Sequence, residues 1–451
     1  MIKSKTRIFN YEGGEIQRVQ CVYPESWESL DFFNLSGDPD AFKALCDFYG
    51  FHVVAKHPAV FGRMVFFKRN DDIPIPESMG KYIDPGVEDP LLKVASAFRK
   101  CLKVKKNNSI CCKDPEISDY IRKLTDLGCL RILSGKLPHT MILPVGDTLG
   151  FMSKTLRDAA FKVNASFFVM DCFDVASPYD IIGTPFGMCI KNGVMLSPPL
   201  FGREALTVTK DKEIRIAKPQ ITDYSLSVGN TEFIHGVNCE FLERPAKAKV
   251  TLKGKTGIAI VGRKVVAVKS SGRMDIPASG FLIRTESAHG ILAGAKVTYK
   301  GCEDLLFAVQ TGNSIMIDGK ETEGFISGFY NIKKPWTVSY PPSLYPLNYE
   351  RARAARIALG ADKDGNPMLV WLEGKSKAKY ISGMESTGAS LSETVKICRE
   401  LGMHNGVNLD GGGSAQILLN GQRELRISDR NLEDNTEHER PVPLGLCVRD
   451  P

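Results

Sequence analysis

The sequence lacks the signals that mark membrane, exported and metal-stapled proteins. No apolar run of signal-peptide length follows the N-terminal Met1, and no stretch of about 18 apolar residues without charge occurs anywhere. The 12 cysteines include no C-x-x-C pair, and the seven histidines never form H-x-H or H-E-x-x-H. We therefore expect a cytoplasmic protein with reduced thiols, no membrane span, no metal and no cofactor, with association with a virus particle as the alternative location.

Strong charge of one sign is also absent. The 59 basic and 52 acidic side chains leave a net charge of +7, which is compatible with an anionic substrate without proving one. The 451 residues are enough to bury ~75% of the extended surface, so no crosslink is needed for a stable core. The 41 glycines and 25 prolines favour many turns and therefore a strand-rich fold.

The first 135 residues mix strand and helix signals. Short apolar runs at His52–Val54 and Met64–Phe67 predict strands, and apolar residues spaced along one face predict helices from about Pro90 to Lys103 and from Ile117 to Leu127. The proline- and aspartate-rich segment Asp71–Pro90 indicates a long loop or linker. We expect residues 1–135 to form a smaller α/β accessory region of unknown role.

A run of basic residues lies between these two helices. One interpretation is a polyanion-binding patch, and the other is a solvated helix end, where cations are favourable. No aromatic residues alternate with the lysines to stack on bases, which favours the solvated helix end. The run comprises Lys100, Lys103, Lys105, Lys106 and Lys113.

Beyond residue 136 the pattern becomes one of short apolar runs separated by turn residues. A short helix over Thr155–Phe161 is followed by segments whose spacing predicts hairpins and antiparallel sheet. A later helix is framed by an S-x-x-E capping box at Ser390 and Glu393 and ends at Gly402. The expected fold class is therefore α+β, with a β-rich mixed or antiparallel sheet domain and flanking helices. The turn signals are Gly183–Pro185, Lys191–Gly193, Gly262–Arg263, Asp318–Gly319 and Asp364–Gly365.

The segment 406–421 carries the strongest chemical signal. Val407 and Leu409 alternate with Asn408 and Asp410, so a strand would bury the first pair and direct the second pair elsewhere. The three glycines 411–413 suit a backbone that approaches a ligand closely or amides that converge on an anion. A tight connection between strands is the alternative, and the absence of a following lysine excludes a nucleotide-binding P-loop.

The string Asn408–Ser414 resembles the hallmark motif of the phosphodiester glycosidase family. Asn164–Phe168 is similar to a second family segment, although the glycine that usually follows the asparagine is Ala165 here, which narrows the space beside that backbone. Further blocks occur in family order and cover about residues 137–450, so we expect a phosphodiester glycosidase-like domain at 136–451. These blocks are Thr184–Gly187, Asn192–Gly193, Ile276–Phe281, Ile315–Lys320, Arg356–Gly360 and Glu439–Val442.

The resemblance implies hydrolysis of a sugar-1-phosphodiester to a free sugar and a phosphate monoester. Two carboxylates normally handle the oxocarbenium-like state of such a reaction, and Asp410 is the first candidate for nucleophile or base. Arg356 is the candidate phosphate partner, because its planar fork suits two phosphate oxygens. We expect a sugar phosphate or glycan as partner, and neither membrane nor nucleic acid. The candidate substrate-binding residues are Asn164, Phe168, Asn408, Gly411, Gly412, Gly413 and Ser414.

Several alternatives remain open. Arg356 is alternatively the partner of a structural ion pair, and Arg440 and Glu393 favour structural interpretations, as a brace of the closing strand and a helix cap. His404 is either a proton-transfer group or a loop residue. Residues 362–373 match part of a calcium loop but favour a simple hairpin. A non-catalytic glycan-binding or structural module is the alternative to an enzyme.

Overall fold

The computed structural model describes most of the chain outside a few internal segments. Of residues 52–53, 64–67, 103–104, 110, 130–133 and 449 it describes the backbone alone. The described residues are 2–35, 52–53, 64–67, 73–83, 94, 97–98, 100–101, 103–104, 110–127, 130–133, 149–156, 158–170, 177, 179–180, 183–244, 249–286, 288, 290–322, 352–376, 380–431 and 434–449.

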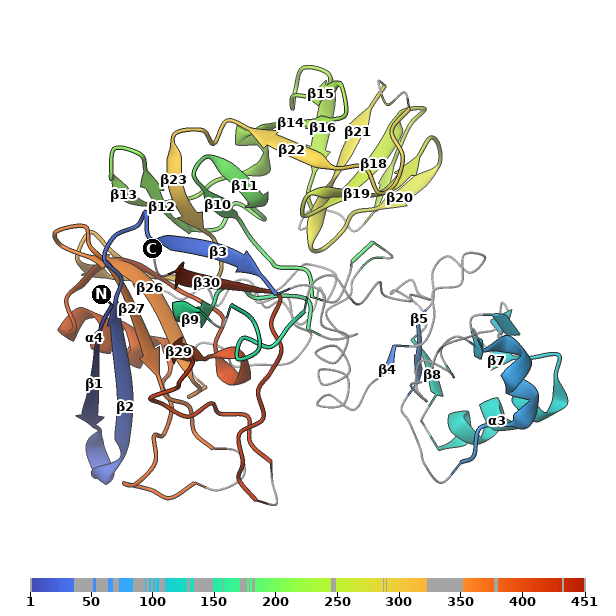
Figure 1. Cartoon of the computed structure of the whole chain (residues 1–451). Helices are drawn as coiled ribbons and strands as arrows, with labels where there is room; N and C mark the ends of the chain where they lie inside the picture. Colours follow the sequence, from blue (N-terminus) through green and yellow to red (C-terminus); the bar gives the residue numbers. More distant parts are fainter. Residues whose placement is uncertain are drawn as a thin grey trace.

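The largest sheet has seven strands in the order β1-β2-β27-β26-β28-β24-β25. Figure 1 labels four of these strands, β1, β2, β26 and β27. All neighbouring strands of this sheet are antiparallel. Helix α4 (Leu391–Glu400) packs its apolar side chains, including Val395 and Cys398, against one face of this sheet. The strands are β1 (Lys3–Asn10), β2 (Ile16–Tyr23), β24 (Ser314–Ile317), β25 (Lys320–Glu321), β26 (Arg356–Asp362), β27 (Pro367–Leu372) and β28 (Met403–Asn408).

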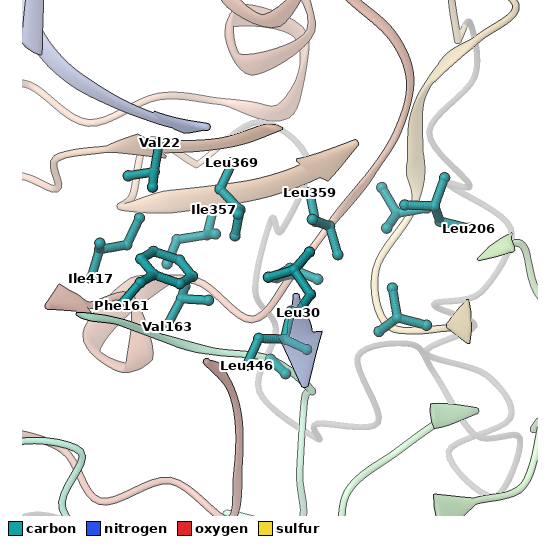
Figure 2. Close-up of a cluster of buried hydrophobic side chains, with 14 of the residues drawn as sticks. Val22, Leu30, Phe161, Val163, Leu206, Ile357, Leu359, Leu369, Ile417 and Leu446 are labelled. Carbon is teal, nitrogen blue, oxygen red and sulfur yellow. The ribbon is translucent and has the colours of Figure 1, made fainter. Parts of the chain in front are cut away.

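The main hydrophobic core lies on the other face of that sheet. A four-stranded antiparallel sheet, β29-β9-β30-β3, contributes Phe161, Val163 and Leu446 to this core, and β26 contributes Ile357 and Leu359 (Figure 2). Burying large aliphatic and aromatic side chains from both sheets stabilises their packing by roughly 1.5–3 kcal/mol per side chain. The strands are β3 (Leu30–Asn34), β9 (Ala159–Asn164), β29 (Ile417–Leu419) and β30 (Leu444–Arg449).

The strands between residues 3 and 34 belong to these two sheets. Strand β2 pairs with β27, and β3 pairs with β30, so this segment packs with residues from the end of the chain. Residues 3–34, which were expected to fall in the accessory region, therefore share sheets with strands of the segment 136–451. The boundary at residue 135 stays a prediction.

A further group of strands lies between β9 and β24 in the sequence. A five-stranded sheet β11-β10-β23-β12-β13 shares the main core, and smaller sheets form a second core around Phe233, Phe281 and Ile283. The strands are β10 (Cys189–Lys191), β11 (Val194–Ser197), β12 (Ala205–Thr209), β13 (Ile214–Ala217), β14 (Ser225–Val228), β15 (Thr231–Phe233), β16 (Cys239–Leu242), β17 (Lys249–Thr251), β18 (Thr256–Val261), β19 (Lys264–Lys269), β20 (Arg273–Asp275), β21 (Gly280–Thr285), β22 (Val297–Lys300) and β23 (Leu305–Val309).

A smaller cluster of elements follows β3. Helix α3 (Pro115–Asp126) is capped by the Asp114 side chain, and its apolar face packs with Met79 and Phe98 in a core of its own. The expected helix near Pro90–Lys103 is helical at residues 94, 97–98 and 100–101, whereas Lys103 already belongs to strand β6. The other residues of that range lie outside the described ones, as do Lys105 and Lys106. The other elements are β4 (His52–Val53), β5 (Met64–Phe67), β6 (Lys103–Val104), β7 (Ile110–Cys111), β8 (Leu130–Leu133) and the 3-10 turn η2 (Glu77–Tyr82).

Four of the five predicted turns connect strands, whereas one helix prediction fails. These four join β10 to β11, β18 to β19, β24 to β25 and β26 to β27, and Ser390 caps α4 through the expected box. At the fifth, Gly183 lies in a turn and Pro185 forms a β-bridge with Phe168. Thr155–Phe161 is not a helix, because the chain turns near residue 155 and then enters β9, whose pairing with β29 and β30 outweighs the local preference. The described structure confirms the α+β, β-rich fold class. The remaining 3-10 turns are η1 (Glu12–Gly14), η4 (Ile221–Asp223) and η5 (Gly412–Ser414).

Candidate active site

The glycine motif follows directly after strand β28, at the edge of the main core. Val407 and Leu409 are buried in that core, as the alternation predicts, and the Leu409 amide donates to the Ile357 carbonyl of β26 at 2.7 Å. Asn408 and Asp410 therefore occupy the alternate positions. The chain leaves the sheet at Asp410, where the three glycines and the 3-10 turn η5 begin.

Glycine is favoured at each of the three positions of the motif for a different steric reason. A Cβ on Gly411 would lie 2.6 Å from the Ala355 carbonyl oxygen, and one on Gly413 would lie 1.8 Å from Asp429 Oδ2. Gly412 faces open space but has φ +59, a conformation that favours glycine. The backbone at Gly411 and Gly413 is therefore closely packed against its neighbours, whereas Gly412 between them faces open space.

The expected anion nest of three amides is not formed. The Gly412 amide donates to the Ala355 carbonyl at 2.8 Å, and the Gly411 amide donates to the Asp410 carboxyl. Both donors are therefore used by the protein itself. If an anion binds beside the motif, side chains must supply most of the recognition.

Asp410 has a buried carboxyl group with a raised pKa. Burial raises the pKa of Asp410 from 3.8 to about 7, and the Ser414 hydroxyl, the Arg440 charge and the Gly411 amide act in the opposite direction. The approach of Ser414 falls short of a well-formed hydrogen bond, because Asp410 Oδ2 and Ser414 Oγ are both buried without a partner among the described residues. A carboxyl with a pKa near 7 can exchange a proton at neutral pH.

Asn164 joins β9 to the motif. Its Nδ2 donates to the Asp410 carbonyl at 2.7 Å, and its Oδ1 accepts from the Gln416 amide at 3.0 Å. The Asp410 amide in turn donates to the Ala165 carbonyl at 3.1 Å. The structure thus brings Asn164 and Asp410 together, as the site prediction requires, with the asparagine side chain fixing the backbone on both sides of the glycines.

Arg356 is directed to backbone carbonyls. Its Nε donates to the Ala389 carbonyl at 3.0 Å and its Nη2 donates to the Ala352 carbonyl at 2.8 Å, and the residue is buried. Its Cα lies beside Gly411, so the residue is near the motif although these two donors serve the fold. These contacts place Arg356 as a brace between β26 and the segment before α4.

Asn408 and Phe168 are both buried. The Asn408 side-chain amide donates to the Leu409 carbonyl at 2.7 Å, and the Asn408 carbonyl accepts from Thr311 Oγ1 at 2.6 Å. Phe168 lies after β9 and forms a β-bridge with Pro185. The substrate contacts predicted for both residues remain predictions.

The ion pair between Asp429 and Arg440 is a part of the site that sequence reasoning missed. Arg440 donates to Asp429 Oδ2 from Nε at 2.9 Å and lies 2.7 Å from it through Nη2. Arg440 does brace its segment, as predicted, but it also lies against Gly413. Asp429 gave no signal, because it stands in a polar stretch without periodicity.

Other titratable groups take structural positions. His404 belongs to strand β28 and packs on Gly319, so its interpretation as a loop residue is wrong. Glu393 completes the capping box of α4, as predicted. Asp362 Oδ1 accepts the amides of Asp364 and Asn366, both at 2.9 Å, which confirms the hairpin at that turn.

The described ranges contain no cluster that would hold a metal ion and no helix that would span a membrane. Within them, no group of three or more histidine, cysteine or acidic side chains is arranged to hold a metal ion. None of the helices in the same part of the chain combines the length and the hydropathy needed to span a bilayer.

Comparison with known proteins connects this geometry to a family. The model of the phosphodiester glycosidase family matches residues 231–449, a span that contains Arg356, the glycine motif and Arg440. N-acetylglucosamine-1-phosphodiester alpha-N-acetylglucosaminidase from mouse is 33% identical over 98 residues, and the bovine and human enzymes are 32% identical over 98 residues. These matches cover 22% of this chain but only 17% of the mouse enzyme.

Two solved structures also match over nearly the whole chain. The catalytic domain of the zebrafish enzyme of that name, auto-inhibited by its pro-peptide, is 12% identical with a TM-score of 0.37, covering 100% of this chain and 83% of its own. A hypothetical protein from Synechocystis is 15% identical with a TM-score of 0.44, covering 99% and 62%. The family match confirms the resemblance predicted from the sequence: residues 231–449 of this chain resemble the phosphodiester glycosidase family.

Proposed function

We propose that this chain is a hydrolase that cleaves a sugar-1-phosphodiester to a free sugar and a phosphate monoester. The observation that carries the proposal is the position of Asp410. It is a buried carboxyl with a pKa of about 7, at the end of a strand and directly before the glycine motif. The matched family is one of phosphodiester glycosidases, which supports the same reaction class.

The chemistry requires a carboxylate beside the anomeric carbon. Cleavage of the glycosidic bond passes through an oxocarbenium-like state, and the leaving phosphate is a weak base that needs little protonation. Ionised Asp410 serves as the base that takes a proton from the attacking water, or as the nucleophile. Its pKa of about 7 makes the ionised form abundant at and above neutral pH.

The surroundings of Asp410 support a fixed orientation. Asn164 holds the Asp410 carbonyl, and the Gly411 amide donates to the carboxyl itself. Such preorganisation keeps the reacting group in place before substrate arrives. The described donors of Arg356 are directed to carbonyls, so the proposal assigns it to supporting the motif.

The test is a hydrolysis assay with the purified chain. A panel of α- and β-linked sugar-1-phosphodiesters and nucleotide sugars is incubated with it, and the released sugar is measured. The wild type is expected to release sugar from at least one substrate and Asp410→Asn from none. Asp126→Asn is the matched control, because Asp126 is an exposed residue of α3, and it should retain turnover.

Two results would overturn the proposal. Undiminished turnover in Asp410→Asn removes this carboxyl from the mechanism. Binding of a glycan or sugar phosphate with no product from any substrate favours the alternative, a glycan-binding module.

A further inference from the structure

The ion pair of Asp429 and Arg440 lies directly against Gly413 of the glycine motif. Asp429 Oδ2 receives both Nε and Nη2 of Arg440, at 2.9 and 2.7 Å, so the guanidinium plane is fixed on one edge. The Asp429 side chain is fully buried, whereas the Arg440 side chain retains 9% exposure. The aspartate is thus an internal anchor, and the arginine reaches the boundary of the fold.

Gly413 is the residue through which this pair meets the motif. A Cβ at that position would lie 1.8 Å from Asp429 Oδ2 and 2.3 Å from Arg440 Nη2. Any side chain there would displace the pair. The absence of a side chain at Gly413 therefore lets a charged group approach the backbone that follows Asp410.

Independent features beside the pair indicate a place for a polar ligand. Asp410 Oδ2 and Ser414 Oγ are buried without a hydrogen-bond partner in the described part of the chain, and an unpaired buried polar atom is unfavourable. Gly412 faces open space. The positive charge of Arg440 acts on the Asp410 carboxyl, so the two side chains belong to one electrostatic site.

We propose that Arg440, oriented by Asp429 against Gly413, binds the phosphate group of the substrate beside Asp410. This inference rests on the proposed function and deepens it by naming the anion-binding residue. An arginine suits a phosphate because its planar fork donates to two oxygens at once. Asp429 acts as a positioning residue, since it holds the guanidinium without facing the ligand.

Arg440 fits this role better than Arg356. Arg356 donates from Nε and Nη2 to two backbone carbonyls. If the guanidinium turned to a ligand, these buried carbonyl acceptors would lose their partner. The contacts of Arg440 include a carboxylate partner and the Met170 sulfur, 3.7 Å from Nη1. A thioether is a weak acceptor, so a phosphate oxygen can replace it with a gain in hydrogen bonding.

The test measures binding of inorganic phosphate by calorimetry, independently of any turnover. Arg440→Lys keeps the charge but loses the fork, and we expect its phosphate affinity to fall at least about tenfold, the effect of one charge-assisted hydrogen bond. Arg122→Lys, at an exposed arginine of α3, is the matched control and should bind phosphate like the wild type, and Arg356→Lys tests the other arginine beside the motif. A double variant, Asp429→Asn with Arg440→Gln, leaves no unpaired buried charge and should abolish binding while keeping a folded circular-dichroism spectrum.

Asp429→Asn separates orientation from simple charge. Removal of a negative charge strengthens phosphate binding if only Coulomb attraction matters, whereas loss of the anchor weakens it. We expect weaker binding, and tighter binding would remove Asp429 from the positioning role. Phosphate affinity that is unchanged in Arg440→Lys, or lost only in Arg356→Lys, overturns the inference.

The hydrolysis assay distinguishes this inference from the proposed function. If the chain shows no turnover but binds phosphate in a way that depends on Arg440, the anion site is kept and the hydrolase proposal is rejected. If the wild type turns over substrate, but Arg440→Lys changes neither phosphate binding nor KM, the hydrolase proposal is kept and the anion site is rejected. With both correct, Arg440→Lys raises KM for the phosphodiester and leaves the Asp410-dependent step in place.

Discussion

The protonation of Asp410 makes the stability of the fold depend on pH in a calculable way. Folding raises the pKa of this carboxyl from 3.8 to about 7, so the native state holds the proton more tightly than the unfolded chain. The resulting stabilisation is fully present below the unfolded value and is lost as the pH rises through about 7. A shift of about three units corresponds to roughly 4 kcal/mol over the whole range.

The substitution Asp410→Asn removes this titration. Asparagine keeps an acceptor for the Gly411 amide and carries no charge, so the variant resembles the protonated native state. Between about pH 5 and about pH 8.5, linkage predicts that the wild type loses roughly 2–3 kcal/mol that the variant does not lose. All other titrating groups are common to both proteins, so they cancel in the difference.

The assay is denaturant unfolding of both proteins across this pH range, followed by tryptophan fluorescence. Trp27 and Trp371 lie in the same core as Leu409, so their signal reports the unit that contains the motif. The difference in unfolding free energy between variant and wild type should grow with pH and level off above about pH 8. A difference that is flat with pH would refute the argument that burial governs this carboxyl.

Further substitutions test the packing around the motif and at one buried carboxylate outside it. Gly413→Ala should destabilise the fold by about 1–3 kcal/mol or more through the clash with the ion pair, whereas Gly412→Ala should cost about 1 kcal/mol for its φ of +59 alone; equal denaturation midpoints would contradict this. Asn164→Ala should cost about 1–3 kcal/mol for each of the two buried backbone groups that it leaves unpaired. Asn164→Asp should cost at least as much in the same measurement, because it sets a buried carboxylate oxygen against the Asp410 carbonyl. Asp180→Ala should lower the melting temperature without changing phosphate affinity, because Asp180 Oδ1 accepts from the Ala278 and Ser279 amides, and an altered affinity would place it in the site.

Local sequence signals predicted the elements around the site well. Alternation placed Val407 and Leu409 in the core, the Ser390 capping box began α4, and Asp-Gly pairs formed the hairpins. Each of these features depends on residues close together in the chain, where backbone geometry and side-chain period decide the outcome. The failed helix at Thr155–Phe161 shows the limit, because strand pairing with distant segments decided that structure.

The distinction between the two arginines was beyond local reasoning. The β26–β28 register sets Ala358 opposite Asn408, and this places Arg356 close to the motif, as expected for a site residue. Which groups its guanidinium reaches depends on Ala389 and Ala352, which belong to segments outside the strand. Arg440 reaches Gly413 only because β30 and the chain before it return beside β9.

Ala165 shows how the fold absorbs a departure from the family pattern. An alanine beside Asn164 suggested less space for whatever approaches that backbone. In the structure its Cβ lies in the main core, while its carbonyl accepts the Asp410 amide at 3.1 Å and its amide donates to the Leu444 carbonyl at 3.1 Å. The backbone of this residue, and not its side chain, faces the motif. An extra methyl group therefore adds to core packing and leaves the contact between Asn164 and Asp410 unobstructed.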